Sequence, residues 1–229
     1  MPGIRQMQRE SAMELISQVA VQMIARGGYD AMTLANVGQL AGYSRGLATH
    51  HFGSKAGLLE SVLGTILAKN AEVFRSVTEG KVGRERFAAI IDSALSRCVE
   101  APDQARAYLM LTLEPTATWA AARLIDQTIQ FREAAEDAAR DAIARGEISS
   151  DWHPADVASI ASAMARGYAY EWAADPQTDL MDARRRVATF VASLGGNSMP
   201  PKRTSTAVDT RRGSRTRDSK KAAADDPSG

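Results

Sequence analysis

Residues 33–55 have the sequence TLANVGQLAGYSRGLATHHFGSK, which predicts two short helices joined by a tight turn. The first helix is expected over residues 34–41 and the second over residues 45–51. Each follows a hydroxyl residue, Thr33 or Ser44, that can accept a hydrogen bond from the first-turn amides, which have no partner inside the helix. Two helices joined in this way form a helix-turn-helix, whose second helix can lie in the major groove of DNA.

The composition of the 229-residue chain is ordinary for a soluble protein and permits one large domain or two small ones. No apolar run reaches the ~20 residues that a membrane span needs, and the N-terminus lacks the apolar core of a signal peptide. The single cysteine, Cys98, rules out an internal disulfide and favours a cytoplasmic location. Because only three histidines accompany it, no metal site is expected. The net charge is +1, so any binding to nucleic acid must come from locally placed charge.

Apolar residues recur at three- and four-residue steps along almost the whole chain, which predicts an all-α fold. Besides the pair already described, helices are expected over about residues 8–26, 54–78, 84–100, 102–115, 117–145, 154–176 and 178–194. Glycines and prolines separate these segments. The expected organisation is a three-helix domain over residues 1–53, a larger helical domain over 54–195 and a tail over 196–229.

The tail differs sharply in composition from the rest of the chain. Residues 197–229 have no aromatic residue and are rich in Ser, Thr, Lys, Arg and Asp. Such a segment cannot bury enough surface to offset its ordering entropy, so it is expected to be disordered. Its excess of basic residues is most often only a solvated charge run, and a role in DNA affinity is the sharper alternative.

The stretch 33–55 resembles the DNA-binding core of the tetracycline-repressor (TetR-type) family of bacterial regulators almost position by position. The resemblance is specific over about residues 8–60 and architectural beyond them. It implies a sequence-specific transcriptional regulator that binds a palindromic DNA operator as a homodimer. It further implies that residues 54–195 bind a small apolar or aromatic effector, which releases a repressor from DNA.

Ala48 and Phe52 lie four residues apart on one face of the second helix, and the resemblance places both inward. Arg45 is then the best candidate for reading a guanine edge, and Gly46 would let the helix approach DNA closely. Leu47 could contact a thymine methyl or pack in the core.

Further residues correspond to positions at which the family commonly holds DNA phosphates, which fix register without specifying sequence. Thr49 stands where the family usually has an aromatic residue, which shortens its reach, and Ala56 stands where an acidic residue often follows. The adjacent His50 and His51 point about 100° apart on a helix, which argues for DNA or core contacts and against a shared metal ion. The expected DNA-binding residues are Thr33, Ser44, Arg45, Gly46, Leu47, Thr49, His50, His51 and Lys55.

The effector pocket is expected among the middle helices, with a wall of methionine and aromatic side chains. Arg166 or Glu171 could anchor a polar group, and any one of the wall residues could equally be ordinary core. Small residues of the last two helices, such as Ala158 and Ala183, are expected to permit close packing in a dimer. The expected ligand-binding residues are Tyr108, Met110, Trp119, Phe131, Met164, Arg166, Tyr168 and Trp172.

Other functions remain to be weighed against this interpretation. An enzyme is not expected, because the sequence has no plausible nucleophile and base, no phosphate-binding glycine loop and no paired carboxylates. No cofactor is implied. The alternatives are an all-helical small-molecule carrier and a nonspecific DNA-binding protein, and the sequence does not separate a repressor from an activator.

Overall fold

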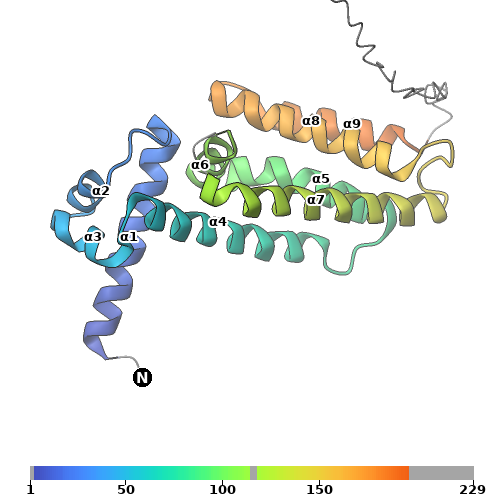
Figure 1. Cartoon of the computed structure of the whole chain (residues 1–229). Helices are drawn as coiled ribbons and strands as arrows, with labels where there is room; N and C mark the ends of the chain where they lie inside the picture. Colours follow the sequence, from blue (N-terminus) through green and yellow to red (C-terminus); the bar gives the residue numbers. More distant parts are fainter. Residues whose placement is uncertain (1–2, 114–117, 196–229) are drawn as a thin grey trace, which may run out of the picture.

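The computed structural model describes residues 3–113 and 118–195, and its fold is all-α, as the sequence predicts. The tail expected to be disordered lies outside the described residues. Three helices form one end of the molecule and the remaining helices form an elongated bundle (Figure 1). The helices of the described part are α1 (Ile4–Gly27), α2 (Leu34–Leu40), α3 (Arg45–Phe52), α4 (Lys55–Thr78), α5 (Gly83–Glu100), α6 (Pro102–Thr112), α7 (Thr118–Ala144), α8 (Pro154–Ala174) and α9 (Leu180–Ser193).

The first three helices enclose a small apolar core. Ile16, Ala20 and Ile24 of α1 are buried at four-residue steps, and they pack with Val37 of α2 and Ala48 of α3. The chain leaves α1 through Gly28, whose φ of 74° is cheap only for glycine and whose amide donates to Ile24. The core thus holds the three helices at fixed angles to one another.

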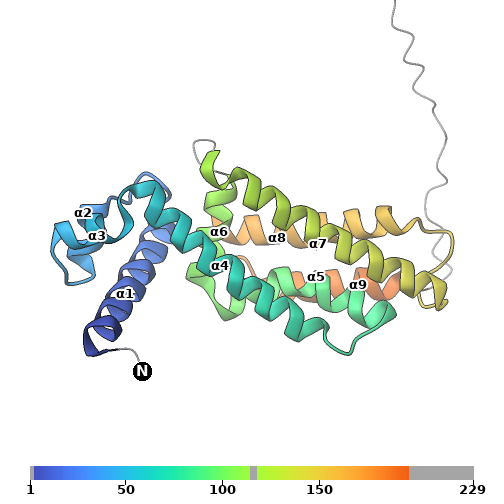
Figure 2. The same cartoon turned by 60° about the horizontal axis from the view of Figure 1, so that its bottom comes forward.

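Helix α4 connects this end of the molecule to the bundle (Figure 2). Leu58, Leu59 and Val62 in its first half belong to the core of the first three helices. Leu63 contacts the start of α7 instead, in a separate small cluster that contains Leu124. The apolar core of the N-terminal region therefore extends beyond residue 53, the expected end of its domain.

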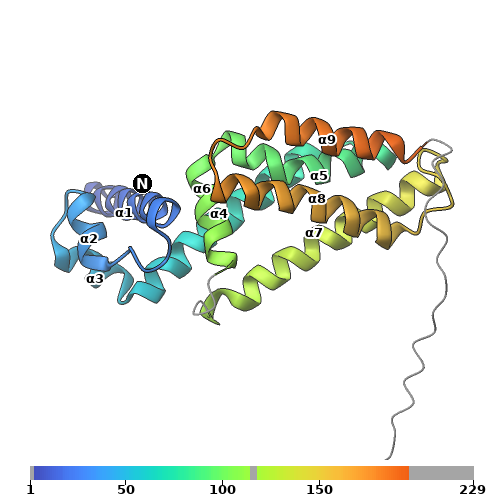
Figure 3. The same cartoon turned by 90° about the horizontal axis from the view of Figure 1, so that it is seen from above.

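In the bundle, α8 and α9 lie side by side on the face opposite α4, with α5 and α7 between the two layers (Figures 1 and 3). The carboxylate of Asp141 on α7 satisfies the first amide of α5, because the N–H of Gly83 donates to it at 2.7 Å. Arg184 of α9 binds Asp92 of α5 through both oxygens, at 2.8 and 2.7 Å. These contacts fix α5 against the helices on either side of it.

Helix α6 takes part in both cores. Ala107 and Leu111 are buried among the residues of the N-terminal core. Ala105 and Leu109, on the other side of the same helix, are buried in the bundle core. A movement of α6 would therefore change the packing of both cores.

The length and the apolar content of a helix decide whether it can cross a membrane. Among the residues that the structure describes, no helix is both long enough and apolar enough to cross a membrane.

Candidate nucleic-acid interface and cavity

Helix α3 presents one face to the core and another to solvent. Ala48 has no exposed surface and Phe52 is half-buried, as the sequence predicts for the inward face. Gly46 and Thr49 are exposed, and a Cβ built at Gly46 would meet no atom within 4 Å. Leu47 is half-buried and packs against the N-terminal core, so its side chain is only partly available to a partner.

Of the two hydroxyl residues predicted to cap α2 and α3, only one makes the cap hydrogen bond. Thr33 caps α2 by accepting from the amide of Asn36 at 3.2 Å. The expected cap at α3 is wrong, because the side chain of Ser44 occupies the N-cap position without making a cap hydrogen bond. The turn itself depends on Gly42, whose φ is 79°. Its backbone geometry positions α3 without the help of the serine hydroxyl.

The start of α4 lies next to α3 and carries a positive charge. Ser54 accepts from the amide of Gly57 at 3.1 Å and caps the helix, as expected. The ammonium of Lys55 lies 3.9 Å from the centre of the Tyr29 ring, a cation–π contact that orients the lysine. A helix N-terminus with a fixed lysine beside it is a favourable place for a phosphate.

The two adjacent histidines differ in environment. His50 is exposed, whereas His51 is half-buried and its ring lies 5.5 Å from that of His50, edge to face. Burial, followed by the charges of Arg9 and His50, lowers the pKa of His51, so its ring is neutral at pH 7. In the free chain the neutral ring can donate one hydrogen bond to a phosphate. The described residues contain no group of three His, Cys, Asp or Glu side chains that could hold a metal ion.

Arg45, the residue expected to read bases, begins α3. The position of its side chain lies outside what the structure describes, so its contact with DNA stays a prediction. Its backbone lies one residue before the exposed Gly46, at the N-terminal end of α3.

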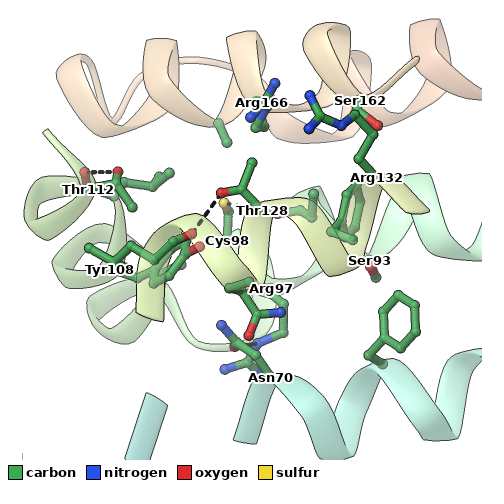
Figure 4. A pocket seen from close by; sticks show the side chains of 18 of the residues that line it. Asn70, Ser93, Arg97, Cys98, Tyr108, Thr112, Thr128, Arg132, Ser162 and Arg166 are labelled. Atoms are coloured by element: carbon green, nitrogen blue, oxygen red, sulfur yellow. Dashed lines mark hydrogen bonds between the residues drawn. The ribbon is translucent and has the colours of Figure 1, made fainter. Parts of the chain in front are cut away.

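The bundle contains a partly open cavity of about 530 Å³ between α4, α5, α6, α7 and α8. Part of its wall is apolar, with Val73, Phe74, Leu109, Leu124, Ile129 and Phe131. The rest is polar and includes Asn70, Arg97, Thr128, Arg132, Ser162 and Arg166 (Figure 4). This volume lies within the range of roughly 300–1,000 Å³ typical of small-molecule sites.

Tyr108, Phe131 and Arg166 line this cavity, among the ligand-binding residues expected from the sequence. Burial raises the pKa of Tyr108 to about 12, so its hydroxyl stays protonated in the physiological range. Cys98 also lines the wall, and burial raises the pKa of its thiol to about 11. That thiol donates to the carbonyl of Ala94 at 3.5 Å, and a buried thiol with a raised pKa is unreactive.

Met110, Met164, Tyr168 and Trp172 do not line the cavity, which corrects their expected place in its wall. On α8, Met164 and Tyr168 each follow a cavity residue by two positions, so they point about 200° away from it. Both pack against the bundle core, in which Trp172 is itself buried. Met110 packs between the two cores, and the side chain of Trp119 lies outside the described part.

Sequence reasoning missed most of the polar wall. Arg97 and Arg132 line the cavity, but polar residues that face a cavity have the same spacing in the sequence as polar residues that face water. The sequence pattern therefore could not distinguish them from an ordinary solvated helix face. The usable signal was Ser162, which lies one helical turn before Arg166, a residue already considered as an anchor.

The fold thus combines a helix-turn-helix at one end with an all-α bundle that contains a cavity. Residues 16–62 match the family model described as bacterial regulatory proteins, tetR family. This match includes the two short helices and their turn, so the resemblance seen in residues 33–55 is confirmed for that part of the chain.

A curated relative is the HTH-type transcriptional regulator BetI of Burkholderia lata, which is 33% identical over 91 residues. The match covers 39% of this chain and 45% of BetI, so the chain spans about half the length of the curated relatives it matches.

Two solved structures share the fold over most of both chains. A TetR transcription regulator from Haloarcula marismortui has a TM-score of 0.68 at 18% identity and covers 81% of this chain and 98% of its own. A transcriptional regulator from Saccharomonospora viridis, solved in complex with choline, also has a TM-score of 0.68 at 18% identity, over 80% of this chain and 96% of its own. At this identity the likeness shows the fold alone.

Proposed function

We propose that this chain is a sequence-specific DNA-binding transcriptional regulator that binds a palindromic operator as a homodimer. The observation that carries the proposal is the orientation of α3, which buries Ala48 and turns Gly46 and Thr49 outward at the free end of the molecule. An exposed glycine on a recognition helix lets the backbone approach the base edges. Lys55 and the capped start of α4 supply a phosphate contact beside it.

The homodimer is proposed to form through α8 and α9. The large exposed apolar side chains on these helices are Ile160, with 40% of its surface exposed, and Met181, with 61%. Ala158 and Ala183, which were expected to allow close packing with a second copy, are instead buried in the core of their own protomer. The dimer contact is therefore assigned to the outward faces of these helices.

The regulator is proposed to act as a repressor that a ligand releases from DNA. Tyr108 and Thr112 of α6 line the cavity, while Ala107 and Leu111 of the same helix pack in the N-terminal core. A ligand that displaces α6 would change the angle at which the core holds α3. Because coupling between two sites is reciprocal, operator DNA must weaken ligand binding by the factor by which ligand weakens DNA binding.

The proposal is tested by selecting bound genomic fragments with the purified full chain at near-physiological salt. A single enriched palindrome would support it, and Arg45→Ala should abolish the enrichment while leaving thermal stability nearly unchanged. Binding without sequence preference that collapses with salt would favour a nonspecific DNA-binding protein. A folded dimer that retains no fragment, even after removal of any co-purified small molecule, would favour a carrier.

A further inference from the structure

The polar part of the cavity wall carries three positive charges. Arg97, Arg132 and Arg166 line it, whereas no Asp or Glu is among the described residues that do so. Arg97 donates to the amide oxygens of Asn70 and Gln104, both at 3.2 Å, which orient the guanidinium without neutralising it. None of the ion pairs found in the described part of the chain includes any of the three arginines.

Ser162 contributes a buried polar group to the same wall. Only 3% of its surface is exposed, and its Oγ atom is buried with no hydrogen-bond partner in the described structure. Two other hydroxyls of the cavity wall donate to their own helix, Ser93 to Ile90 at 2.6 Å and Thr128 to Leu124 at 2.9 Å. A buried hydroxyl without a partner is costly, so this atom calls for a partner that the protein does not supply.

The unpartnered hydroxyl lies beside two of the arginines. Ser162 and Arg166 are one helical turn apart on the same side of α8. Figure 4 shows Arg132 of α7 and Arg166 on the side of the cavity next to α8, whereas Arg97 and Asn70 lie on the side of α4. Together, Arg132, Ser162 and Arg166 provide only donors of hydrogen bonds and positive charge, apart from the serine lone pairs.

The apolar part of the wall is large enough to take a hydrocarbon body. The rings of Phe74 and Phe131 meet edge to face, with centroids 6.4 Å apart, and Leu109 and Leu124 extend the apolar surface. A ligand with an apolar body and one charged end would therefore match both parts of the cavity at once.

We propose that the cavity binds an amphiphilic anion, with its carboxylate or phosphate head held by Arg132, Ser162 and Arg166. In the proposed function this anion is the effector that releases the operator. A quaternary ammonium, the chemistry of the choline bound by the Saccharomonospora viridis protein, would meet three positive charges and no carboxylate in the described wall. The cavity therefore selects against cations of this kind.

Titration calorimetry on the full chain tests this proposal with four ligands of equal chain length, the charged ones below their micelle concentrations and the alcohol below its solubility limit. These are decanoate, decyl phosphate, 1-decanol and decyltrimethylammonium. At least one of the two anions should bind about tenfold more tightly than the alcohol, because charge-assisted hydrogen bonds to arginine are the strong ones. The cation should bind more weakly than the alcohol. Equal binding of anion, alcohol and cation, or no binding of either anion, would overturn the proposal.

Three variants and a control locate the head group. Arg132→Gln, Arg166→Gln and Ser162→Ala should each lower the affinity for the anion about fivefold or more and leave the affinity for 1-decanol unchanged. Ser162→Ala should also raise the melting temperature of the free chain, because it removes a buried hydroxyl without a partner. Arg140→Gln removes the same charge from an exposed position of α7 outside the cavity and should leave both affinities unchanged. A loss of anion affinity in this control equal to that in the cavity variants would contradict the assignment.

The result is independent of whether the chain regulates transcription. Anion binding without operator selection would leave the cavity assignment in place and contradict the proposed function. Operator selection without anion binding would leave the regulator and contradict the proposed ligand class.

Discussion

Replacing Gly46 with alanine should make the protein more stable and a poorer DNA binder at the same time. Gly46 lies in the first turn of α3, and an added Cβ would meet no atom within 4 Å. Glycine in a helix costs about 0.5–1 kcal/mol relative to alanine, so the free energy of unfolding should rise by roughly half a kcal/mol at this position near the helix end. No other contact of the folded chain is changed.

The same methyl group would stand between α3 and the base edges in the proposed complex. The loss of close approach should cost about as much as one base contact, roughly 1–3 kcal/mol, which corresponds to about a 5- to 150-fold loss of operator affinity. Urea denaturation gives the stability, and fluorescence anisotropy with the selected operator gives the affinity.

A control substitution distinguishes the groove face from other exposed sites. Ala68→Ser changes an exposed position of α4 away from the proposed interface and should leave operator affinity unchanged. If Gly46→Ala binds the operator as tightly as the parent, this face of α3 does not approach DNA. If it lowers the free energy of unfolding, the orientation of α3 described above is wrong.

Three further substitutions test the two cores and the cavity. Ala48→Asp should lower the free energy of unfolding by about 3–5 kcal/mol, because it buries a charge without a partner, and a stable variant in urea denaturation would show that α3 is turned differently. Burial raises the pKa of Tyr108 from 10 to about 12, so the folded chain binds that proton more tightly and stability should fall as the pH rises from 10 to 12. Tyr108→Phe should lose about 2–3 kcal/mol less than the parent over this window in denaturation at stepped pH, and an identical loss would contradict the burial argument. Arg184→Leu breaks the ion pair with Asp92 and should cost at most about 1 kcal/mol, less at high salt, whereas an effect of several kcal/mol would show that the pair is more than a partly exposed contact.

The helices could be predicted from the sequence because their ends carry local chemical signals. Ser54 caps α4, Gly28 ends α1 in a positive-φ conformation and Pro154 begins α8, and each of these acts through atoms within a few residues. Ser44 shows the limit of such signals. It occupies the expected N-cap position, but the turn at Gly42 already sets the geometry and its hydroxyl makes no cap hydrogen bond.

The inward face of α8 could not be predicted from its largest apolar residues. Ile160 lies at helical spacing from the apolar residues Val157 and Met164, yet 40% of its surface is exposed, whereas Ala161 and Ala165 are fully buried. Neighbouring helices on several sides leave room only for small side chains there, and larger ones are displaced to the periphery. The cavity could not be recognised from the sequence because Arg132 and Arg166 line its solvent-exposed part, so their sequence pattern is that of an ordinary solvated face.

The sharing of α4 and α6 between the two cores has a consequence for how the chain unfolds. Leu59 and Val62 of α4 and Leu111 of α6 complete the N-terminal core, so that core cannot remain intact once these helices have melted. Leu109 of α6 likewise belongs to the bundle core. Heat should therefore disrupt both cores in one cooperative transition, with equal calorimetric and van't Hoff enthalpies, although the fold has the outline of two domains. A ligand that binds only in the bundle would then protect the helix-turn-helix from thermal unfolding as well.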